Sequence, residues 1–376
     1  MFCVFIYCMY KIKQILEDFI VKEITNTELK DSGNYTYFIL KKKNYTTERA
    51  VSAIAHYLKT DRKNIGYAGS KDKNAITEQM ISIKGFNKIK DIELKDIELI
   101  YKGRGDERLS LGDLKGNEFV ITVRNLSKEK IKINSKTLSI PNYFDEQRFS
   151  KNNAEIGKSV LKKDFKKAVD LILEDSSEKT SGFEKDVKEH ISRLPNDFIG
   201  AIKKVPKKIR MMYVHAFQSL MFNKTISEII MLKEKEYKKV DYSNGFFVFP
   251  KKEIKNAKIP IIGFGTEFKN NKLRDISLKI LEEEGIKLRD FIIRGMPELA
   301  SEGNERDMFV IAEDIKTKVE KDELNKDKKK CIISFKLPKG SYATIVIKKI
   351  FNDNNSDLFA CTKIVTTKKL LKKKDL

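Results

Sequence analysis

The segment of this 376-residue chain best suited to chemistry is Gly66–Gln79, GYAGSKDKNAITEQ. Asp72 lies between Lys71 and Lys73, whose positive charges favour the ionised carboxylate. A carboxylate in a glycine-bearing loop before a strand can act as a nucleophile or as a general base. The sequence Lys-Asp-Lys-Asn is also typical of a solvated turn, so the pattern alone leaves both interpretations open.

Two further segments have residue types suited to binding. Pro141–Ser150, PNYFDEQRFS, interleaves aromatic residues with amides and an arginine, a mixture that suits base stacking and phosphate contacts. A strand edge that packs Phe144 and Phe149 into a core would show the same pattern. Leu337–Thr344, LPKGSYAT, could place a phosphate at a helix start, although strand–turn–helix connections commonly have this composition.

The elements that position these segments are predicted from hydrophobic spacing and turn residues. Thr46 or Thr47 can cap a helix that runs through Ala50, Ile54 and Leu58, and the catalytic candidate follows it in a loop over Asn64–Asn74. Strands are predicted at Asp18–Ile24, Tyr35–Lys41, Ile76–Lys84 and Asn117–Arg124.

The composition changes after residue 150, where long Lys-rich helical stretches begin. Lys316–Lys330 has almost no apolar residues and indicates a linker or a hairpin tip. The order of strands, then helices, then strands indicates one α+β domain interrupted by another. Later strands are predicted at Gly245–Phe249, Ile259–Phe264 and Cys331–Leu337, and a last helix at Ala343–Ile350.

The charge of the chain favours an anionic partner. Lysine and arginine number 76 against 54 aspartates and glutamates, a formal net charge of +22. Nucleic acid is the usual partner of such a surplus, through phosphate contacts and counterion release. Enrichment of lysine on the surface of heat-adapted proteins is the alternative explanation.

Several classes of protein are excluded by the sequence. No run of about 18–20 apolar residues could span a membrane, and the start, MFCVFIYCMY, lacks the charged region and cleavage site of a signal peptide. Met9 is an alternative initiator, so residues 1–8 are an open question. With 3 His, 4 Cys and no CxxC pair, neither a zinc site nor a disulfide scaffold is expected, which predicts a reducing, cytoplasmic location. No glycine-rich nucleotide loop is present, so no nucleotide cofactor is expected.

Taken together, the motifs resemble those of the TruD family of tRNA pseudouridine synthases. Gly69–Gln79 matches the family signature G-x-K-D-x-x-A-x-T-x-Q at every fixed position. Four other segments resemble family blocks in family order, so the resemblance extends over residues 17–344: EDFIVKEI, RLSLGDLKGNEF, YVHAFQSLMFN and LPKGSYAT.

The resemblance implies an α+β pseudouridine synthase catalytic core with a mixed, mainly antiparallel sheet, interrupted by an α/β insertion domain. We place the core at 1–152 and 334–376 and the TruD-type insertion at 153–333. The implied activity is isomerisation of a uridine in tRNA, typically at position 13, by a monomeric enzyme. Isomerisation consumes neither redox equivalents nor phosphate, so we expect no cofactor and no metal. The alternative is a non-catalytic RNA-binding protein on the same scaffold.

The resemblance also assigns site residues. Asp72 matches the catalytic aspartate, which can attack C1′ or C6 or abstract a ribose proton. Phe144 matches the aromatic residue that stacks on the uracil, and Asn142 matches a residue that positions it. Lys13 lies where the family often has a basic partner for the aspartate.

Two further residues are expected near the substrate. Phe19 would line the pocket, and Lys71, like Lys13, would keep Asp72 ionised. The chain departs from the family pattern N-x-F-G-x-Q-R-F-G, because Asp145 and Ser150 replace both glycines. We therefore expect the backbone near Phe144 to differ and two more acidic groups to lie beside it.

Overall fold

We describe the chain from a computed structural model of residues 10–86, 90–127, 135–174 and 182–353. These residues divide into two compact units. The first holds the described residues up to Ser139 together with Ile311–Ala343, and the second holds Ile140–Val310 and Thr344–Asp353. Each unit has its own buried core.

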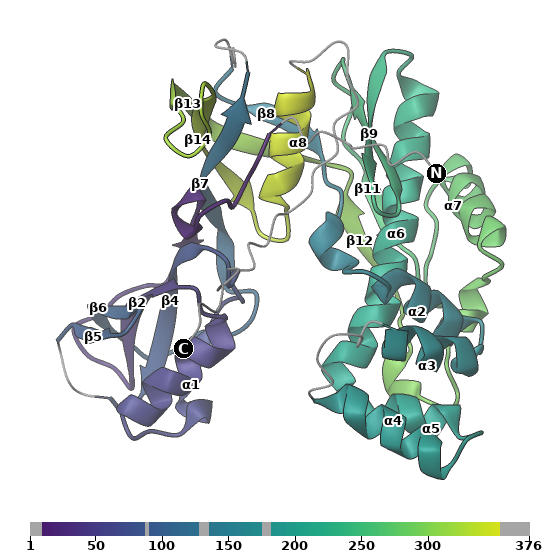
Figure 1. Cartoon of the computed structure of the whole chain (residues 1–376), viewed down its shortest axis with the longest axis horizontal. Coiled ribbons are helices and arrows are strands. Elements are labelled where there is room, and N and C mark those ends of the chain that lie inside the picture. The colour runs from purple at the N-terminus through teal and green to yellow at the C-terminus, as the bar shows by residue number, and fades with distance from the viewer. Residues whose placement is uncertain (1–9, 87–89, 128–134, 175–181, 354–376) are drawn as a thin grey trace, which may run out of the picture. The chain divides into compact units, whose positions relative to one another are not determined.

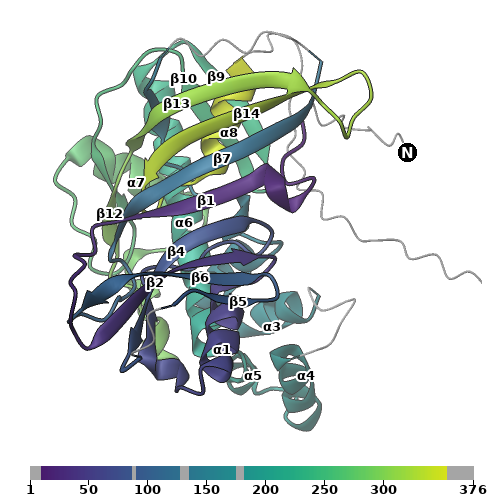
Figure 2. The same ribbon diagram turned by 90° about the vertical axis from the view of Figure 1, so that its left-hand side faces the viewer.

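A ten-stranded mixed sheet, most of it in the first unit, is the largest feature of the described residues (Figure 1). Its order is β5-β6-β2-β4-β1-β7-β14-β13-β8, with β3 paired to β4, and Figure 2 shows β13, β14, β7, β1 and β4 side by side. β1 and β4 are parallel, whereas β7 is antiparallel to both β1 and β14. The strands are β1 Phe19–Thr25, β2 Tyr35–Lys43, β3 Ile65–Tyr67, β4 Ile76–Lys84, β5 Ile92–Leu94, β6 Ile97–Gly105, β7 Leu114–Leu126, β8 Leu138–Pro141, β13 Phe309–Lys321 and β14 Lys329–Pro338.

Helix α1, Thr47–Tyr57, covers one end of this sheet (Figure 1). The Thr46 side chain caps it by accepting a hydrogen bond from the main-chain N–H of Arg49 at 3.2 Å. The apolar face of the helix, spaced three and four residues apart, packs on alternate residues of β2, β4 and β6. This packing fixes the loop between β3 and β4. The fully buried residues between α1 and the sheet include Val51, Ile54, Phe38, Leu40, Ile81 and Leu99.

The second unit is mainly helical and is organised around the long helix α6, Lys207–Lys233. Small two-stranded sheets join β9 to β10 and β11 to β12. The apolar residues of α6 form much of the core, among them Phe217, Met221 and Phe222. The other elements are α2 Asn153–Leu161, α3 Phe165–Glu174, α4 Phe183–Arg193, α5 Phe198–Lys204, α7 Asn271–Glu283, α8 Ala343–Asp353, β9 Tyr237–Tyr242, β10 Gly245–Pro250, β11 Lys258–Ile261 and β12 Asn304–Asp307, with short 3-10 turns at Leu16–Asp18, Arg62–Asn64, Glu146–Arg148, Leu288–Phe291 and Pro297–Leu299.

The predicted α+β class with a mixed, mainly antiparallel sheet is confirmed. Lys316–Lys330 is a hairpin tip with a shorter turn than predicted, because β13 continues to Lys321 and β14 begins at Lys329. The domain boundaries at 152/153 and 333/334 stay a prediction, and the two compact units divide the chain at other positions. No helix among the described residues is long and apolar enough to cross a membrane. The question of residues 1–8 lies outside the described residues.

Candidate active site

Asp72 lies in the loop that joins β3 to β4, and its side chain is 38% exposed. Its Oδ2 accepts a hydrogen bond from the Lys13 ammonium at 2.7 Å. One carboxylate is thus open to solvent and paired with a cation, a combination suited to acid–base or nucleophilic chemistry.

The Lys13 side chain is much more buried than that of its partner Asp72. Its side chain is 8% exposed, and its ammonium lies 3.9 Å from the centroid of the Phe19 ring, a cation–π contact. Phe19 is buried and packs edge-to-face on Phe119 with centroids 6.2 Å apart. The structure therefore brings together three of the predicted site residues, Lys13, Phe19 and Asp72.

Lys71 has a different partner from the one expected. Its ammonium pairs with the buried carboxylate of Glu23 on β1, and its main-chain N–H donates to Thr47 Oγ1 at 2.9 Å. The direct cationic partner of Asp72 is therefore Lys13, and the Lys71 side chain fastens the loop to β1.

Lys42 on β2 was missed by the sequence analysis. It is 2% exposed, and its ammonium donates to the main-chain oxygens of Tyr45 at 2.6 Å, Asp72 at 2.8 Å and Lys71 at 3.4 Å. Burial lowers the pKa of this amine to about 8, although the charge of Asp72 acts in the opposite direction. Strand alternation could have found it, since Lys42 lies on the same face of β2 as Leu40.

Buried polar side chains also hold the loop that carries Asp72. Gln79 donates to the carbonyl of Gly69 at 2.8 Å and accepts from the Thr47 hydroxyl at 2.9 Å. A Cβ added to Gly66 would lie 2.3 Å from the carbonyl oxygen of Leu109, so glycine is needed there for packing. The motif residues at both ends of the loop therefore fix its shape.

Phe144 belongs to the second unit, where its ring is buried. Asn223 of α6 holds its main chain on both sides, accepting from the Phe144 N–H at 2.9 Å and donating to its carbonyl at 2.8 Å. The guanidinium carbons of Arg306 and Arg148 lie 4.2 and 5.5 Å from the ring centroid, and Phe222 packs edge-to-face at 5.5 Å. The ring is thus rigidly placed beside two cations.

Asn142 lies two residues before this ring and shares one of its cations. Arg306 donates to the main-chain oxygen of Asn142 at 3.0 Å and to its Oδ1 at 2.5 Å. The side-chain amide of Asn142 in turn donates to the carbonyl of Asp307 at 3.0 Å. Arg306 therefore links Asn142 to Phe144, and no motif of the sequence analysis pointed to it.

The two residues that replace the family glycines behave differently. Asp145 is 3% exposed, and its carboxylate pairs with the buried ammonium of Lys348 on α8 at 2.5 Å. Ser150 is exposed and has φ +49°, in the left-handed region that favours glycine. Phe149, which lies between them, and Tyr143, which precedes them, are both fully buried.

The comparisons with known proteins agree with one another. The TruD family model, tRNA pseudouridine synthase D, matches residues 7–193 and 178–350. The chain is 34% identical to "Probable tRNA pseudouridine synthase D" of Methanosarcina acetivorans, covering 90% of this chain and 92% of that protein. It is 32% identical to "tRNA pseudouridine synthase D" of Aquifex aeolicus, covering 91% and 98%.

A solved structure resembles this fold along nearly its whole length. The crystal structure of a TruD protein from Methanosarcina mazei superposes with a TM-score of 0.69 at 27% identity, covering 93% of this chain and 95% of that one. The family model and the curated relatives extend over most of this chain, and the region matched by the family model includes the loop of Asp72. This chain therefore belongs to the TruD family of pseudouridine synthases.

Proposed function

We propose that this chain isomerises a uridine of tRNA, at position 13, to pseudouridine, and that Asp72 is its catalytic residue. One observation carries the proposal: the half-exposed carboxylate of Asp72 is paired with the buried ammonium of Lys13. Asp72 lies in the loop that bears the family signature, and the curated relatives are named tRNA pseudouridine synthase D.

The reaction needs only groups that this chain supplies. The N1–C1′ bond of the nucleotide breaks, the uracil rotates, and a C5–C1′ bond forms. C5 then loses a proton and N1 gains one, so atoms and electrons balance without an oxidant or reductant. Asp72 can attack C1′ or C6, or abstract a ribose proton, and each role uses its carboxylate, which accepts a hydrogen bond from the Lys13 ammonium.

Binding of the uridine is proposed for Phe144 and Asn142 in the second unit. A uridine removed from its stack loses a few kcal/mol, which an aromatic face can partly restore. The firm hold of Asn223 on the Phe144 main chain and the guanidinium of Arg306 beside the ring support this role. We further propose that the protein acts on tRNA as a monomer in the cytoplasm, without a nucleotide cofactor.

Tritium release from tRNA labelled at C5 of uridine tests the proposal, because loss of the C5 proton accompanies the new bond. The native protein should release tritium without an added cofactor, and Asp72→Asn should release none while still binding tRNA. Asp61→Asn is the matched control, since Asp61 is an exposed aspartate of the same unit that pairs only with exposed Lys63 among the described ion pairs.

Each outcome separates the alternatives. Turnover by Asp72→Asn would overturn the assignment of the catalytic residue. Tight tRNA binding with no tritium release from the native protein would support a non-catalytic RNA-binding protein instead. A tRNA substrate in which uridine 13 is replaced by cytidine should release no tritium if position 13 is the target.

A further inference from the structure

Lys13 is carried by a short segment that runs from residue 10 into the 3-10 turn Leu16–Asp18. Its own backbone has φ +57°, a left-handed conformation that costs about 1–2 kcal/mol in a residue with a side chain. Such a conformation persists only where the surrounding structure imposes it. The contacts on either side of Lys13 therefore determine where its ammonium lies.

Arg124 of β7 fixes one side of the segment. Its main-chain N–H and carbonyl exchange hydrogen bonds with those of Lys11, at 2.8 and 2.9 Å. Its side chain is 3% exposed and donates to Asp18 at 2.8 Å. The second oxygen of Asp18 accepts from the main-chain N–H groups of Gln14 and Ile15, at 3.0 and 3.1 Å, and so closes the turn after Lys13.

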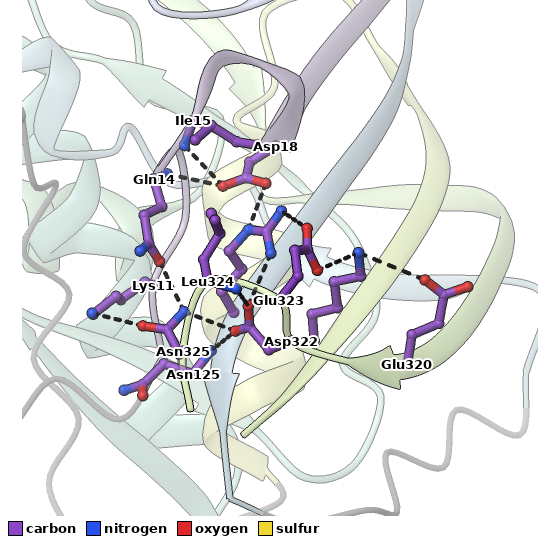
Figure 3. Close-up of polar contacts among 12 residues, drawn as sticks. Lys11, Gln14, Ile15, Asp18, Asn125, Glu320, Asp322, Glu323, Leu324 and Asn325 are labelled. Atoms are coloured by element: carbon purple, nitrogen blue, oxygen red, sulfur yellow. Dashed lines mark hydrogen bonds and ion pairs between the residues drawn. The ribbon is translucent and has the colours of Figure 1, made fainter. Parts of the chain in front are cut away.

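The same arginine also binds the tip of the β13–β14 hairpin, about 200 residues further along the chain. It donates to Asp322 at 2.9 Å and to Glu323 at 3.0 Å, and the Asp322 carboxylate is fully buried. Burial alone would lower the pKa of Arg124, but the hydrogen bonds to Glu323, Asp18 and Asp322 raise it. Figure 3 shows how the hairpin residues meet the segment that contains Ile15 and Asp18.

Asn325 in this hairpin tip contacts the Lys13 segment from both sides. Its Oδ1 accepts from the Lys11 ammonium at 3.0 Å, and its Nδ2 donates to Gln14 Oε1 at 3.0 Å (Figure 3). The same Nδ2 donates to Asp322 at 2.8 Å, which ties the amide to the cluster around Arg124. One amide thus bridges the residues two before and one after Lys13.

We propose that the hairpin tip Asp322–Asn325 positions Lys13 against Asp72, with Asn325 as the decisive positioning residue. The proposal rests on the proposed catalytic role of Asp72. Asn325 acts through Lys11 and Gln14, which hold the strained backbone of Lys13 so that its ammonium lies over Phe19 and within hydrogen-bond distance of the catalytic carboxylate.

The test is a double-variant cycle with Asn325→Ala and Lys13→Ala, measured by tritium release under single- and multiple-turnover conditions. Displacement of a catalytic group by about 1 Å can cost up to about 100-fold in rate. We expect Asn325→Ala to lower kcat about 10- to 100-fold with KM changed less than about 3-fold. In the Lys13→Ala background, the same change should have almost no further effect.

Lys328→Ala is the matched control, because Lys328 is in the same turn between β13 and β14 but its ammonium donates to Ser127 at 2.9 Å. It should leave kcat unchanged. An Asn325→Ala protein that keeps native kcat, or that loses the same factor with and without Lys13, would overturn the positioning role. Asp72→Asn distinguishes the two proposals: if Asp72→Asn is inactive and Asn325→Ala is fully active, only the positioning role fails.

Discussion

The two positions at which the family motif carries glycine should respond in opposite ways when glycine is restored. Ser150 has φ +49° and is exposed, and its main-chain N–H donates to the carbonyl of Glu146 at 3.2 Å, as in a left-handed helix cap. Asp145 has an extended backbone, φ −91° and ψ 174°, which any residue adopts. Restoring glycine therefore relieves strain at Ser150 and relieves none at Asp145.

The magnitudes follow from these two environments. In Ser150→Gly, the left-handed cost of about 1–2 kcal/mol is removed, against a loss of about 0.5–1 kcal/mol from the flexibility of glycine in the unfolded chain. The net gain in the free energy of unfolding should be about 0.5–1 kcal/mol. In Asp145→Gly, the buried Lys348 ammonium loses its carboxylate, and breaking one side of a buried pair costs about 3–5 kcal/mol.

Thermal unfolding of the full chain measures both changes. For a unit of about 180 residues, 1 kcal/mol corresponds to about 2–4 °C. The unfolding transition of the second unit should rise by about 1–4 °C in Ser150→Gly and fall by about 6–20 °C in Asp145→Gly. Adding Lys348→Met to Asp145→Gly should restore part of the loss, because it removes the unpaired charge.

Two results would refute this reasoning. If Asp145→Gly is as stable as Ser150→Gly, then the ion pair with Lys348 contributes nothing to the free energy of unfolding, and position 145 accepts glycine without cost. If Ser150→Gly is less stable than the native chain, then the left-handed backbone of Ser150 stores no strain that glycine can relieve.

Two further predictions concern the loop of Asp72 and the net charge. The pKa of Lys42 is lowered to about 8 from its usual value near 10.5. Between these pH values the folded chain binds fewer protons than the unfolded chain, so this group makes the free energy of unfolding rise with pH. The deprotonated amine can no longer donate to all three carbonyls, so kcat should nevertheless fall as pH rises through about 8. The Lys42→Met protein should have a lower kcat than the native protein and should not show this decline. A native pH–kcat profile that stays flat from pH 7 to 9.5 would contradict the role of Lys42. The affinity for tRNA should fall steeply as salt rises, with a slope of about −0.7 to −0.9 in log K against log salt for each phosphate contact. Filter binding between 50 and 200 mM salt measures this slope. An affinity that does not decline over this range would contradict phosphate-dominated binding.

The sequence predicted the elements whose patterns are local. The strand Ile76–Lys84 has the predicted bounds, because its alternation is regular and it follows a clear loop. Helix α1 begins one residue after Thr46, where a side-chain cap was expected. The sequence placed Asp72 in a loop before a strand, as the structure has it between β3 and β4, and its catalytic role stays a prediction. These features depend on neighbouring residues in the chain, which a sequence displays directly.

The contacts that hold the site were not predictable in the same way. The run Lys316–Lys330 looks like a solvated linker, yet it contains the buried carboxylate of Asp322 and the amide of Asn325. Arg124, the partner of Asp322, lies about 200 residues earlier, and Lys11 and Gln14, which bond Asn325, lie earlier still. Polar composition does not reveal such pairings. Lys42 was hidden in a run of three lysines for the same reason, since burial of a charge is decided by tertiary packing.

The positive surplus of the chain has a structural part as well as a surface part. Lys13, Lys42 and Lys71 surround one loop with their side chains largely withdrawn from solvent, and the carboxylates that they face are Asp72 and Glu23. Together these three ammonium groups and two carboxylates carry one excess positive charge when Lys42 is protonated. If Asp72 is the catalytic residue, such an excess favours both its carboxylate anion and a substrate phosphodiester near it. Part of the +22 charge is therefore built into the interior around Asp72, where no count of surface lysines would find it.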